Sequence, residues 1–537
     1  MEGSGEDRIG MRAAGILYPL FVGQGFSVVL TALTFIIVAR ILGPSSYGIY
    51  TFAFGFSALV NGFLAFGIGA YFSSTLSKLA YKNDGEGILR SLFGGYAIAG
   101  TVGIILTLLG ISISGYVAGT FGHVGISQVI LIVVSGTILS SMMNGAAFGA
   151  LIGFSRSGLA SILTVTVDTI QLLLSIVLTI KFGVIGAVSA MLIGYIFGAL
   201  FGVYLIYVAM SRYCKFRIII PTKAELRGIF SFVWPIATTN LLNTGMQNFS
   251  VLFLGLYVTT AALGNYGAAL KGLALLAMIH SAFGSGLLPV FSTVKSMASE
   301  QELNRIYNMI IHFALLPMLP FVIFIGVMAG PGLNLLVGQN FTSAPLYLTL
   351  IALGTAIGLF GIYISNLLIS GGYTKSVMRI NFISAFFQLA LMLVLVPSEK
   401  IIGAIVIIFF VGNTIEAVLF ERYTKKLYGI RFELKKLARL YLSNIVFGIV
   451  MAGLLVLSMA FLNLGFATMN YMAYIAIGLL EAVVIYPPIL ILFGAVNEGD
   501  IISMRHAASG LGRINGVLGP FLGYAQYLHR LFIGVRT

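Results

Sequence analysis

Charge is what this sequence lacks most. Only 9% of its 537 residues are Asp, Glu, Lys or Arg, whereas 59% are hydrophobic and the mean hydropathy is +1.04. About a quarter of the residues in a soluble domain are charged. These values exclude an ordinary soluble protein and indicate a chain whose solvent is lipid.

Cysteine and spaced metal-ligating residues are scarce as well. The single cysteine, Cys214, excludes an internal disulfide and a cysteine-based metal site, and the five histidines show no ligand spacing. The sequence also has no carboxylate pair of catalytic spacing and no phosphate-cradling glycine loop. We therefore expect no cofactor, no metal and no enzymatic activity.

Long apolar runs dominate what is present. At about 20 residues per crossing, they predict about fourteen transmembrane helices. The run after the polar residues 1–12 is too long for a signal peptide. The predicted helices lie near residues 13–39, 47–72, 91–118, 125–152, 158–180, 183–210, 229–257, 262–290, 307–330, 343–370, 377–397, 401–420, 438–462 and 467–493.

The positions of lysine and arginine predict the orientation. With the N-terminus in the cytoplasm, all but four of the 30 Lys and Arg residues fall on the cytoplasmic side, as the positive-inside rule requires. The four exceptions are Arg40, Lys181, Lys271 and Lys400. We predict a multi-pass protein of the cytoplasmic membrane with both termini in the cytoplasm. Its net charge of +14 then needs no nucleic-acid partner.

Two six-helix halves share short motifs at a nearly constant offset. The offset is 217 or 219 residues for each of four pairs. These pairs are Tyr47-Gly48 and Tyr266-Gly267, 153–156 and 372–375, 185–187 and 402–404, and Gln24 and Asn243. An even number of helices gives both halves one orientation, which is the parallel-repeat plan of secondary transporters.

The predicted fold class is therefore an all-α polytopic membrane protein. It has two parallel six-helix bundles, related by a pseudo-twofold axis, and two appended C-terminal helices. In chain order the segments are a cytoplasmic N-terminus (1–12), the first bundle (13–210), a linker (211–228), the second bundle (229–421), a basic loop (422–437), helices 13 and 14 (438–493) and a cytoplasmic tail (494–537) with a pattern suited to the membrane surface.

Polar residues lie on one face of the first and of the seventh predicted helix. The two sets are Gln24, Ser27, Thr31 and Thr34, and Asn240, Asn243, Gln247 and Ser250, all at spacings of 3, 4 and 3. Polar groups facing lipid are unfavourable. These two sets of residues therefore either join neighbouring helices or line a hydrated central cavity. In the second case the candidate substrate-binding residues are Gln24, Ser27, Thr31, Asn240, Asn243 and Gln247.

Three charged residues in or beside the predicted spans are further candidates. Arg40 and Lys271 lie near the outer ends of their helices. They either extend to the interface or bind an anion, and phosphate suits guanidinium and ammonium groups. Asp168 lies near the middle of the fifth helix, where it either pairs with a cation or carries protons or sodium ions during transport.

Three stretches resemble motifs of one transporter family. "ARILGPSSYGIY" (39–50), "LGNYGAALKG" (263–272) and "GALIGFSRSGLASI" (149–162) resemble stretches of the Wzx-type polysaccharide flippases, in the multidrug/oligosaccharidyl-lipid/polysaccharide exporter superfamily. The resemblance implies two six-helix bundles in a V plus two further helices. It also implies the flipping of a polyprenyl-(di)phosphate-linked oligosaccharide for cell-surface glycan assembly, with phosphate held by Arg40 and Lys271.

The implied partners are this lipid-linked oligosaccharide, membrane lipid, and glycosyltransferases or a polymerase of the same pathway. Two other functions remain open. A cation or drug antiporter of the multidrug and toxin extrusion type has the same twelve-helix core, but typically needs lumenal carboxylates that helices 1, 2, 7 and 8 lack. A membrane-embedded glycosyltransferase or polymerase is disfavoured by the short, nearly uncharged outer loops.

Overall fold

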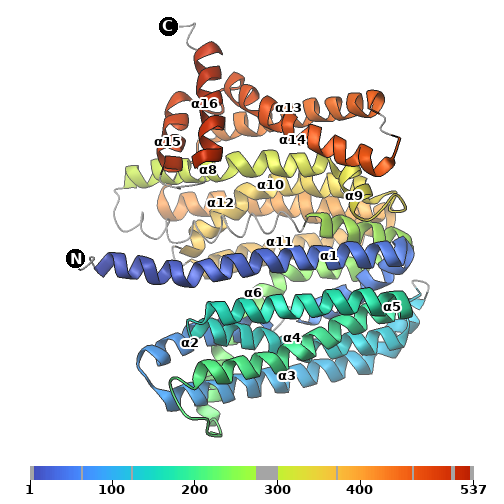
Figure 1. Cartoon of the computed structure of the whole chain (residues 1–537), viewed down its shortest axis with the longest axis vertical. Coiled ribbons are helices and arrows are strands. Elements are labelled where there is room, and N and C mark those ends of the chain that lie inside the picture. Colours follow the sequence, from blue (N-terminus) through green and yellow to red (C-terminus); the bar gives the residue numbers. More distant parts are fainter. Residues whose placement is uncertain are drawn as a thin grey trace. The chain divides into compact units, whose positions relative to one another are not determined.

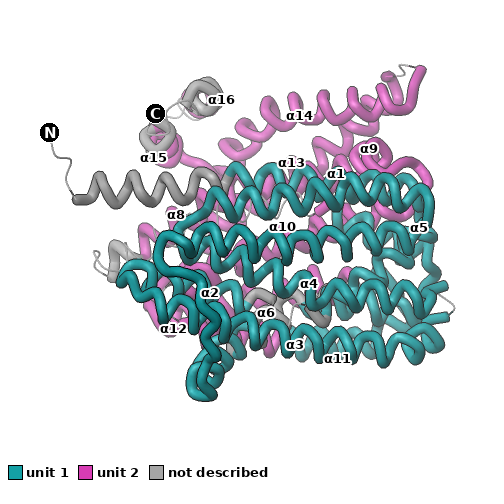
Figure 2. Tube along the Cα trace, turned by 60° about the horizontal axis from the view of Figure 1, so that its bottom comes forward, with its two compact units in different colours: residues 1–271, 385–404 teal, residues 272–384, 405–537 magenta. Residues whose placement is uncertain are grey.

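The computed structural model is helical in every regular element that it describes (Figure 1). It describes residues 5–61, 65–122, 125–273, 300–370, 373–462, 465–509 and 515–532. The chain forms two compact units, which Figure 2 shows in different colours. Unit 1 contains residues 1–271 and 385–404, and unit 2 contains residues 272–384 and 405–537. The predicted all-α class is confirmed.

Unit 1 is a bundle of long helices. They are α1 (Gly5–Asn61), α2 (Ala65–Tyr81), α3 (Gly85–Thr120), α4 (Gln128–Gly153), α5 (Ser157–Met210) and α6 (Lys223–Leu254), followed by a helix described over 260–273. α5 packs against α1 and α4, and α4 also packs against α2 and α3. α4 therefore lies at the centre of this unit, and half or more of its apolar window is buried.

Unit 2 contains the C-terminal part of the chain. Its elements are α8 (Glu300–Val327), α9 (Ala329–Leu336), α10 (Ala344–Ser370), the π-helix η2 (Val406–Gly412), α12 (Asn413–Tyr428), α13 (Leu434–Phe461), α14 (Ala467–Leu492), α15 (Glu498–Ser509) and α16 (Asn515–Phe532). α11 (Thr374–Ile405) is divided between the units. α8 packs against α10 and α13, and α14 packs against α13 and α16.

Three of the long helices each contain one residue in the left-handed region. These residues are Gly43 in α1 (φ 67°), Gly183 in α5 (φ 57°) and Lys400 in α11 (φ 52°). Glycine adopts positive φ readily, whereas for a residue with a side chain such a sparsely populated conformation is unfavourable by about 1–3 kcal/mol. Gly183 and Lys400 are 217 residues apart and have similar ψ values of −132° and −126°. The predicted repeat requires such a match.

Within the described ranges, nine helical stretches are long and apolar enough to cross a membrane. Three of them, Val22–Leu59, Ser157–Met210 and Thr374–Tyr428, have 38, 54 and 55 residues. A single crossing needs only about 20 residues, and each of the three contains one of the left-handed turns. Each therefore corresponds to two predicted crossings. The polytopic class is confirmed, and the number fourteen stays a prediction.

The start of α6 is fixed by a capping box. The Thr222 hydroxyl accepts a hydrogen bond from the Glu225 N–H at 3.3 Å, and the Glu225 carboxylate accepts one from the Thr222 N–H at 2.7 Å. Arg90 on α3 lies 3.3 Å from the same carboxylate. The hydrogen bonds from Thr222, and then Arg90, lower the pKa of Glu225. The segment predicted as a linker, 211–228, thus includes the first turn of this helix.

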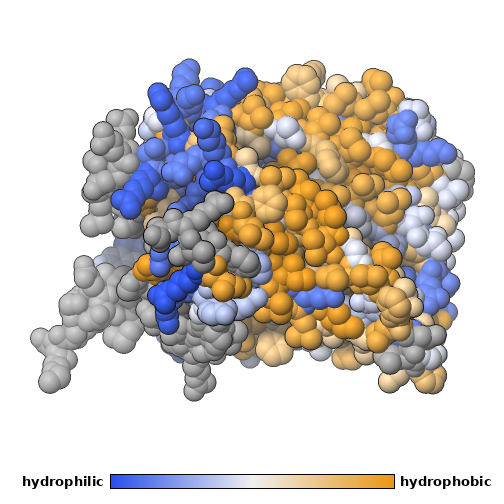
Figure 3. Space-filling model, turned by 90° about the horizontal axis from the view of Figure 1, so that it is seen from above, coloured by the Kyte–Doolittle hydropathy of each residue, from blue (hydrophilic) through white to orange (hydrophobic). Residues whose placement is uncertain are grey.

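Apolar side chains cover a broad area of the face in Figure 3, and hydrophilic residues gather toward one side of it. On α13 and α14 the exposed apolar residues include Ile449, Val456, Leu480 and Val483, each more than half exposed. An apolar surface of this extent is unfavourable in water. Lipid contact explains it, and the protein is a membrane protein.

Candidate functional site

A cavity of about 810 Å³ lies within unit 1, surrounded by α1, α2, α4, α5 and α6. None of the described residues that line it is charged. Its polar lining residues are Gln24, Ser57, Ser73, Ser141, Asn144, Thr164, Tyr195 and Asn248, and Phe54 and Phe148 add aromatic surface. Its volume lies within the usual range of ligand pockets. The cavity therefore suits a neutral polar group better than an ion.

Two hydroxyl groups of the lining, those of Thr164 and Ser57, already donate their protons. Thr164 donates to the Ala160 carbonyl of its own helix at 3.0 Å. Ser57 lies 2.7 Å from the Thr137 hydroxyl, which itself donates to a backbone carbonyl, so Ser57 is the donor of this pair. A hydroxyl that has donated its proton still accepts hydrogen bonds. This part of the wall therefore offers acceptors to a ligand that carries O–H groups.

Asn144 on α4 offers the cavity an amide group. Its Oδ1 atom is buried and has no hydrogen-bond partner among the described residues. The side chain packs against Gly198, where a Cβ atom would overlap it. Nearby, a Cβ atom on Gly149 would overlap the Gly69 backbone, so α2 and α4 are in backbone contact beside the cavity. Small residues thus set both the position of Asn144 and the shape of the wall.

The four residues of the predicted polar face of the first helix have different surroundings. Gln24 lines the cavity. Ser27 donates a hydrogen bond to the Asp168 carboxylate on α5. Thr31 is exposed, and Thr34 donates to a carbonyl one turn earlier in α1 at 2.9 Å. The structure therefore brings Gln24 to the cavity and Ser27 to the candidate ion-coupling residue.

Asp168 lies immediately behind the cavity wall. It follows the lining residue Thr164 by one helical turn, and the lining residue Tyr195 is close enough to it for an electrostatic interaction. Asp168 is half-buried and forms no ion pair within the described residues. Two roles were predicted for this carboxylate. For the first, structural pairing with a cation, the described part of the chain offers no partner.

The two candidate cations lie in different surroundings. Lys271 places its Nζ atom 4.4 Å from the centroid of the Phe54 ring, a cation–π contact. Because Phe54 lines the cavity, Lys271 stands one side chain away from it. Arg40 lies on an exposed part of α1, three residues before the turn at Gly43, and is not among the lining residues.

The polar face of the seventh predicted helix belongs to α6. The side chains of Asn240, Asn243 and Gln247 lie outside the described residues. The next residue, Asn248, lines the cavity, and Ser250 is buried, 3.2 Å from the Tyr266 hydroxyl. α6 therefore contributes to the site.

Sequence reasoning missed Asn144 and Tyr195 because it examined polar faces only on the two helices that match in the repeat. It missed Asn248 because that residue lies outside the 3, 4, 3 spacing of the seventh helix. A signal for Asn144 is present in the sequence. Residues 140–144 read Ser-Ser-Met-Met-Asn within an otherwise apolar run. An isolated amide in such a run is unfavourable unless it meets a partner or water.

A family described as "Polysaccharide biosynthesis protein" has a model that matches residues 37–345, more than half of the chain. Agl15 of Haloferax volcanii, a probable low-salt glycan biosynthesis flippase, is 24% identical over 253 residues. The match covers 46% of this chain and 50% of Agl15. The chain thus spans half the length of this curated relative, and the predicted resemblance is confirmed.

Two solved structures are similar in fold. The lipid II flippase MurJ, in an inward closed conformation, aligns with a TM-score of 0.68 at 15% identity, covering 88% of this chain and 98% of MurJ. An inward-facing multidrug resistance MATE family transporter of the MOP superfamily aligns with a TM-score of 0.64 at 17% identity, covering 75% of this chain and 94% of the transporter. At these identities the likeness shows the fold alone.

Proposed function

The chain belongs to the polysaccharide biosynthesis protein family, and from this premise we propose that it flips a polyprenyl-(di)phosphate-linked oligosaccharide across the cytoplasmic membrane. The observation that carries the proposal is the neutral cavity of unit 1. Its hydroxyl and amide acceptors suit the O–H groups of a sugar, and Phe54, Phe148 and Tyr195 offer aromatic surface to the sugar ring.

The proposed saccharide contacts start from the cavity wall. Gln24, Asn144 and Thr164 bind sugar hydroxyls there. From the sequence pattern we infer that Thr31, Asn240, Asn243 and Gln247 bind further sugar hydroxyls. Their neutral side chains exchange hydrogen bonds with a sugar without the large desolvation penalty of a buried charge.

The proposed phosphate contacts are the two cations near the predicted outer ends of their helices. Lys271 already lies beside the cavity residue Phe54. Arg40 is exposed at the end of the first part of α1. Ammonium and guanidinium groups both form charge-assisted hydrogen bonds with phosphate. This arrangement holds the anion at the edge of the bilayer while the sugar occupies the neutral cavity.

Transport is proposed to follow alternating access between the two bundles, 13–210 and 229–421, with both termini in the cytoplasm. Asp168 would couple the cycle by exchanging a proton or a cation, because its carboxylate lies behind the cavity wall with Ser27 as its donor. The polyprenyl chain would stay in lipid beside helices 438–493. Glycosyltransferases or a polymerase of the same pathway would supply and use the lipid-linked glycan.

A flipping assay in proteoliposomes, with a fluorescent polyprenyl-diphosphate oligosaccharide, tests the proposal. We expect the double variant Gln24→Ala/Asn144→Ala to flip the lipid at least tenfold more slowly, since each lost hydrogen bond contributes about 0.5–1.5 kcal/mol. Ser112→Ala is the matched control, because Ser112 is exposed and donates to its own helix. Equal rates for the double variant and the wild type would disprove a role for this cavity.

Asp168, which forms no ion pair with any described residue, favours one other candidate function, a drug or cation antiporter of the multidrug and toxin extrusion type. The MATE family transporter shares the fold, and such antiporters need a carboxylate near the substrate path. Loading the same proteoliposomes with ethidium separates the two functions. Asp168-dependent ethidium export without glycan flipping would support the antiporter.

A further inference from the structure

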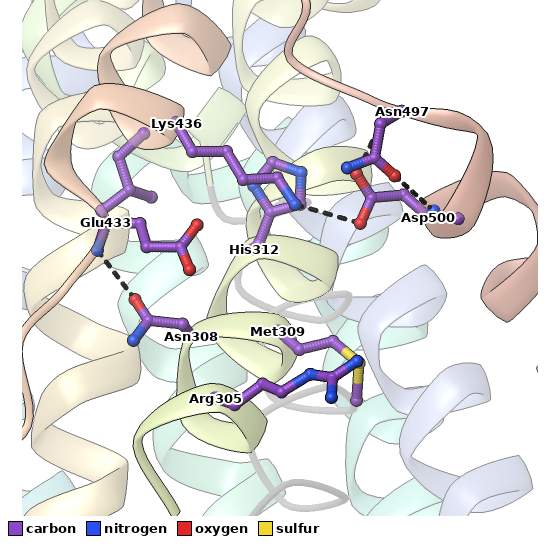
Figure 4. Close-up of a pocket in the computed structure, with 10 residues that line it drawn as sticks. Arg305, Asn308, Met309, His312, Glu433, Lys436, Asn497 and Asp500 are labelled. Carbon is purple, nitrogen blue, oxygen red and sulfur yellow. Dashed lines mark hydrogen bonds and ion pairs between the residues drawn. The ribbon is translucent and has the colours of Figure 1, made fainter. Parts of the chain in front are cut away.

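A second pocket, of about 280 Å³, lies within unit 2. It is formed by residues 305–312 of α8, the start of α13 and the start of α15 (Figure 4). In contrast to the cavity of unit 1, it is rich in charged side chains. It does not contribute to the cavity of unit 1, and its ligand can be inferred from its own residues.

His312 forms the buried wall of this pocket. Its side chain is 3% exposed, and neither ring nitrogen makes a hydrogen bond of normal geometry to a described residue. The Ala495 backbone carbonyl lies near the ring. In Figure 4 the Lys436 side chain passes beside the imidazole. Buried polar groups without partners are rare, so a hydrogen-bonding group in the pocket would complete the partners of the ring nitrogen that does not face Ala495.

Two cations, Arg305 and Lys436, and two carboxylates, Glu433 and Asp500, line the same space. Lys436 forms an ion pair with Asp500 at 3.0 Å, and both side chains are largely shielded, at 26% and 12% exposed. Arg305 lies nearer the start of α8 in Figure 4, with Met309 between it and His312. It is exposed and forms no ion pair within the described residues. The guanidinium of Arg305 is therefore available to a ligand, while Asp500 holds Lys436 in place.

The start of α13 adds backbone donors. Glu433 precedes this helix without any side-chain capping bond, and the first turn of a helix carries N–H groups that lack partners within the helix. A wider hollow of about 780 Å³ adjoins the same turn and adds Lys435, Arg439 and His529 to its lining. The surroundings of this turn are thus predominantly basic.

The walls of the pocket are fixed by side-chain hydrogen bonds. The Asn308 side chain accepts a hydrogen bond from the Glu433 N–H at 2.9 Å and donates one to the Arg431 carbonyl at 3.0 Å. Asn497 and Asp500 cap each other at the start of α15, at 2.8 and 3.0 Å. A site whose walls are held in this way loses little entropy when a ligand binds.

We propose that this pocket binds a phosphate group, as carried by a phospholipid headgroup or by a soluble phosphate compound. A guanidinium, an ammonium group and the start of a helix are donors that suit the oxygens of a phosphate, and the imidazole of His312 offers one further hydrogen-bonding nitrogen. The volume of the pocket admits a single headgroup. The site is distinct from the proposed saccharide cavity, and it does not depend on the flippase proposal.

Isothermal titration of the full-length protein in detergent tests the site. The probes are dihexanoyl phosphatidic acid, inorganic phosphate, and dihexanoylglycerol, which has no phosphate. We expect both phosphate probes to bind and dihexanoylglycerol to give no signal. Phosphatidic acid binding at least tenfold more tightly than phosphate identifies a lipid as the source, and similar affinities identify a soluble compound.

Two variants assign the binding to the pocket. Arg305→Gln should weaken both phosphate probes about tenfold, since it removes a charge-assisted hydrogen bond, whereas Lys375→Gln, an exposed lysine of unit 2 outside the pocket, should not. His312→Phe keeps an aromatic ring but removes its nitrogens, and should weaken binding without lowering the melting temperature. No phosphate binding by the wild type, or binding that is unchanged in Arg305→Gln, would overturn the proposal.

Discussion

The two pockets of this protein differ in the charge of the residues that line them. The cavity of unit 1 has a neutral lining, and its nearest charged groups, Asp168 and Lys271, lie behind lining residues. The pocket of unit 2 has charged groups directly on its walls, with Lys436 paired to Asp500. A neutral wall lets a sugar enter and leave with small changes in desolvation. A charged wall suits a phosphate that stays bound.

The largest effect is expected for a substitution that disrupts the packing of the helices around the neutral cavity of unit 1. Gly149→Leu should lower the free energy of unfolding by about 3 kcal/mol, because its side chain would overlap the Gly69 backbone and separate α2 from α4. Thermal unfolding of the purified protein measures the change. Gly228→Leu is the control, since no atom lies within 4 Å of a Cβ atom there. Similar melting temperatures for the two variants would contradict the packing argument.

Neutralising Asp168, which lies behind the wall of the unit 1 cavity, should have the next largest effect. Asp168→Asn keeps an acceptor for Ser27 but cannot exchange a proton or hold a cation, so we expect at least tenfold slower flipping, a loss of about 1.4 kcal/mol. The flipping rate at several pH values and sodium concentrations measures this. Glu399→Gln, an exposed carboxylate of unit 1, is the control. An Asp168→Asn variant that keeps the wild-type pH and sodium dependence would remove this residue from coupling.

A charged residue introduced into the wall of the unit 1 cavity should slow flipping, because it removes the neutral lining that distinguishes this cavity from the pocket of unit 2. Asn144→Asp is nearly isosteric but introduces a carboxylate into the neutral lining, so flipping should fall about tenfold. Asn144→Ala only loses hydrogen bonds and should reduce flipping about threefold. The two rates are compared in the same proteoliposome assay. If Asn144→Asp flips faster than Asn144→Ala, the neutral lining is not what the substrate requires.

A smaller effect is expected for the cation beside the cavity. Lys271→Gln loses the charge that contacts Phe54 and should raise the KM for the diphosphate lipid about threefold, because a charge-assisted hydrogen bond to phosphate is lost. Lys271→Arg retains a cation and should restore most of the affinity. Equal KM values for Lys271→Gln and Lys271→Arg would show that charge at this position does not act on the substrate.

The smallest effect concerns a surface contact outside both pockets. The hydrogen bonds from Thr222, and then Arg90, lower the pKa of Glu225, so ionised Glu225 stabilises the folded state above the unfolded pKa, near 4.5. This contribution is lost as the pH falls through the lowered pKa. The melting temperature of Glu225→Gln should therefore lie slightly below that of the wild type at pH 7, and the difference should shrink below pH 4.5. A difference that grows on acidification would reverse the assigned sign.

The fold class could be predicted because lipid imposes simple rules on sequence. Long apolar runs and the distribution of Lys and Arg predicted the all-helical membrane class. The turns at Gly183 and Lys400 are separated by 217 residues, which agrees with the offset of the predicted repeat. The joining of two predicted crossings into one long helix was not predicted. A single left-handed residue makes such a turn, and lysine at position 400 carries no sequence signal for it.

The candidate site was only partly predictable. Gln24 and Ser27 could be chosen from a polar helical face, but their separate partners depend on the close packing of α1 and α5, where a Cβ atom on Gly23 would overlap Ser161. Asn144 and Tyr195 meet Gln24 at the cavity only through tertiary packing, which one-helix periodicity does not describe. The role of Arg40 stays a prediction.

The left-handed turns at Gly43 and Gly183 also limit how unit 1 can move. A hinge of one residue leaves no spare chain between consecutive helices, so neither can slide past the other by a whole turn, about 5.4 Å, without unwinding. Each such hairpin must shift as one piece. In the proposed transport cycle, displacements that open the cavity would therefore occur at longer connections such as 211–222, and stiffening that segment should slow the proposed transport.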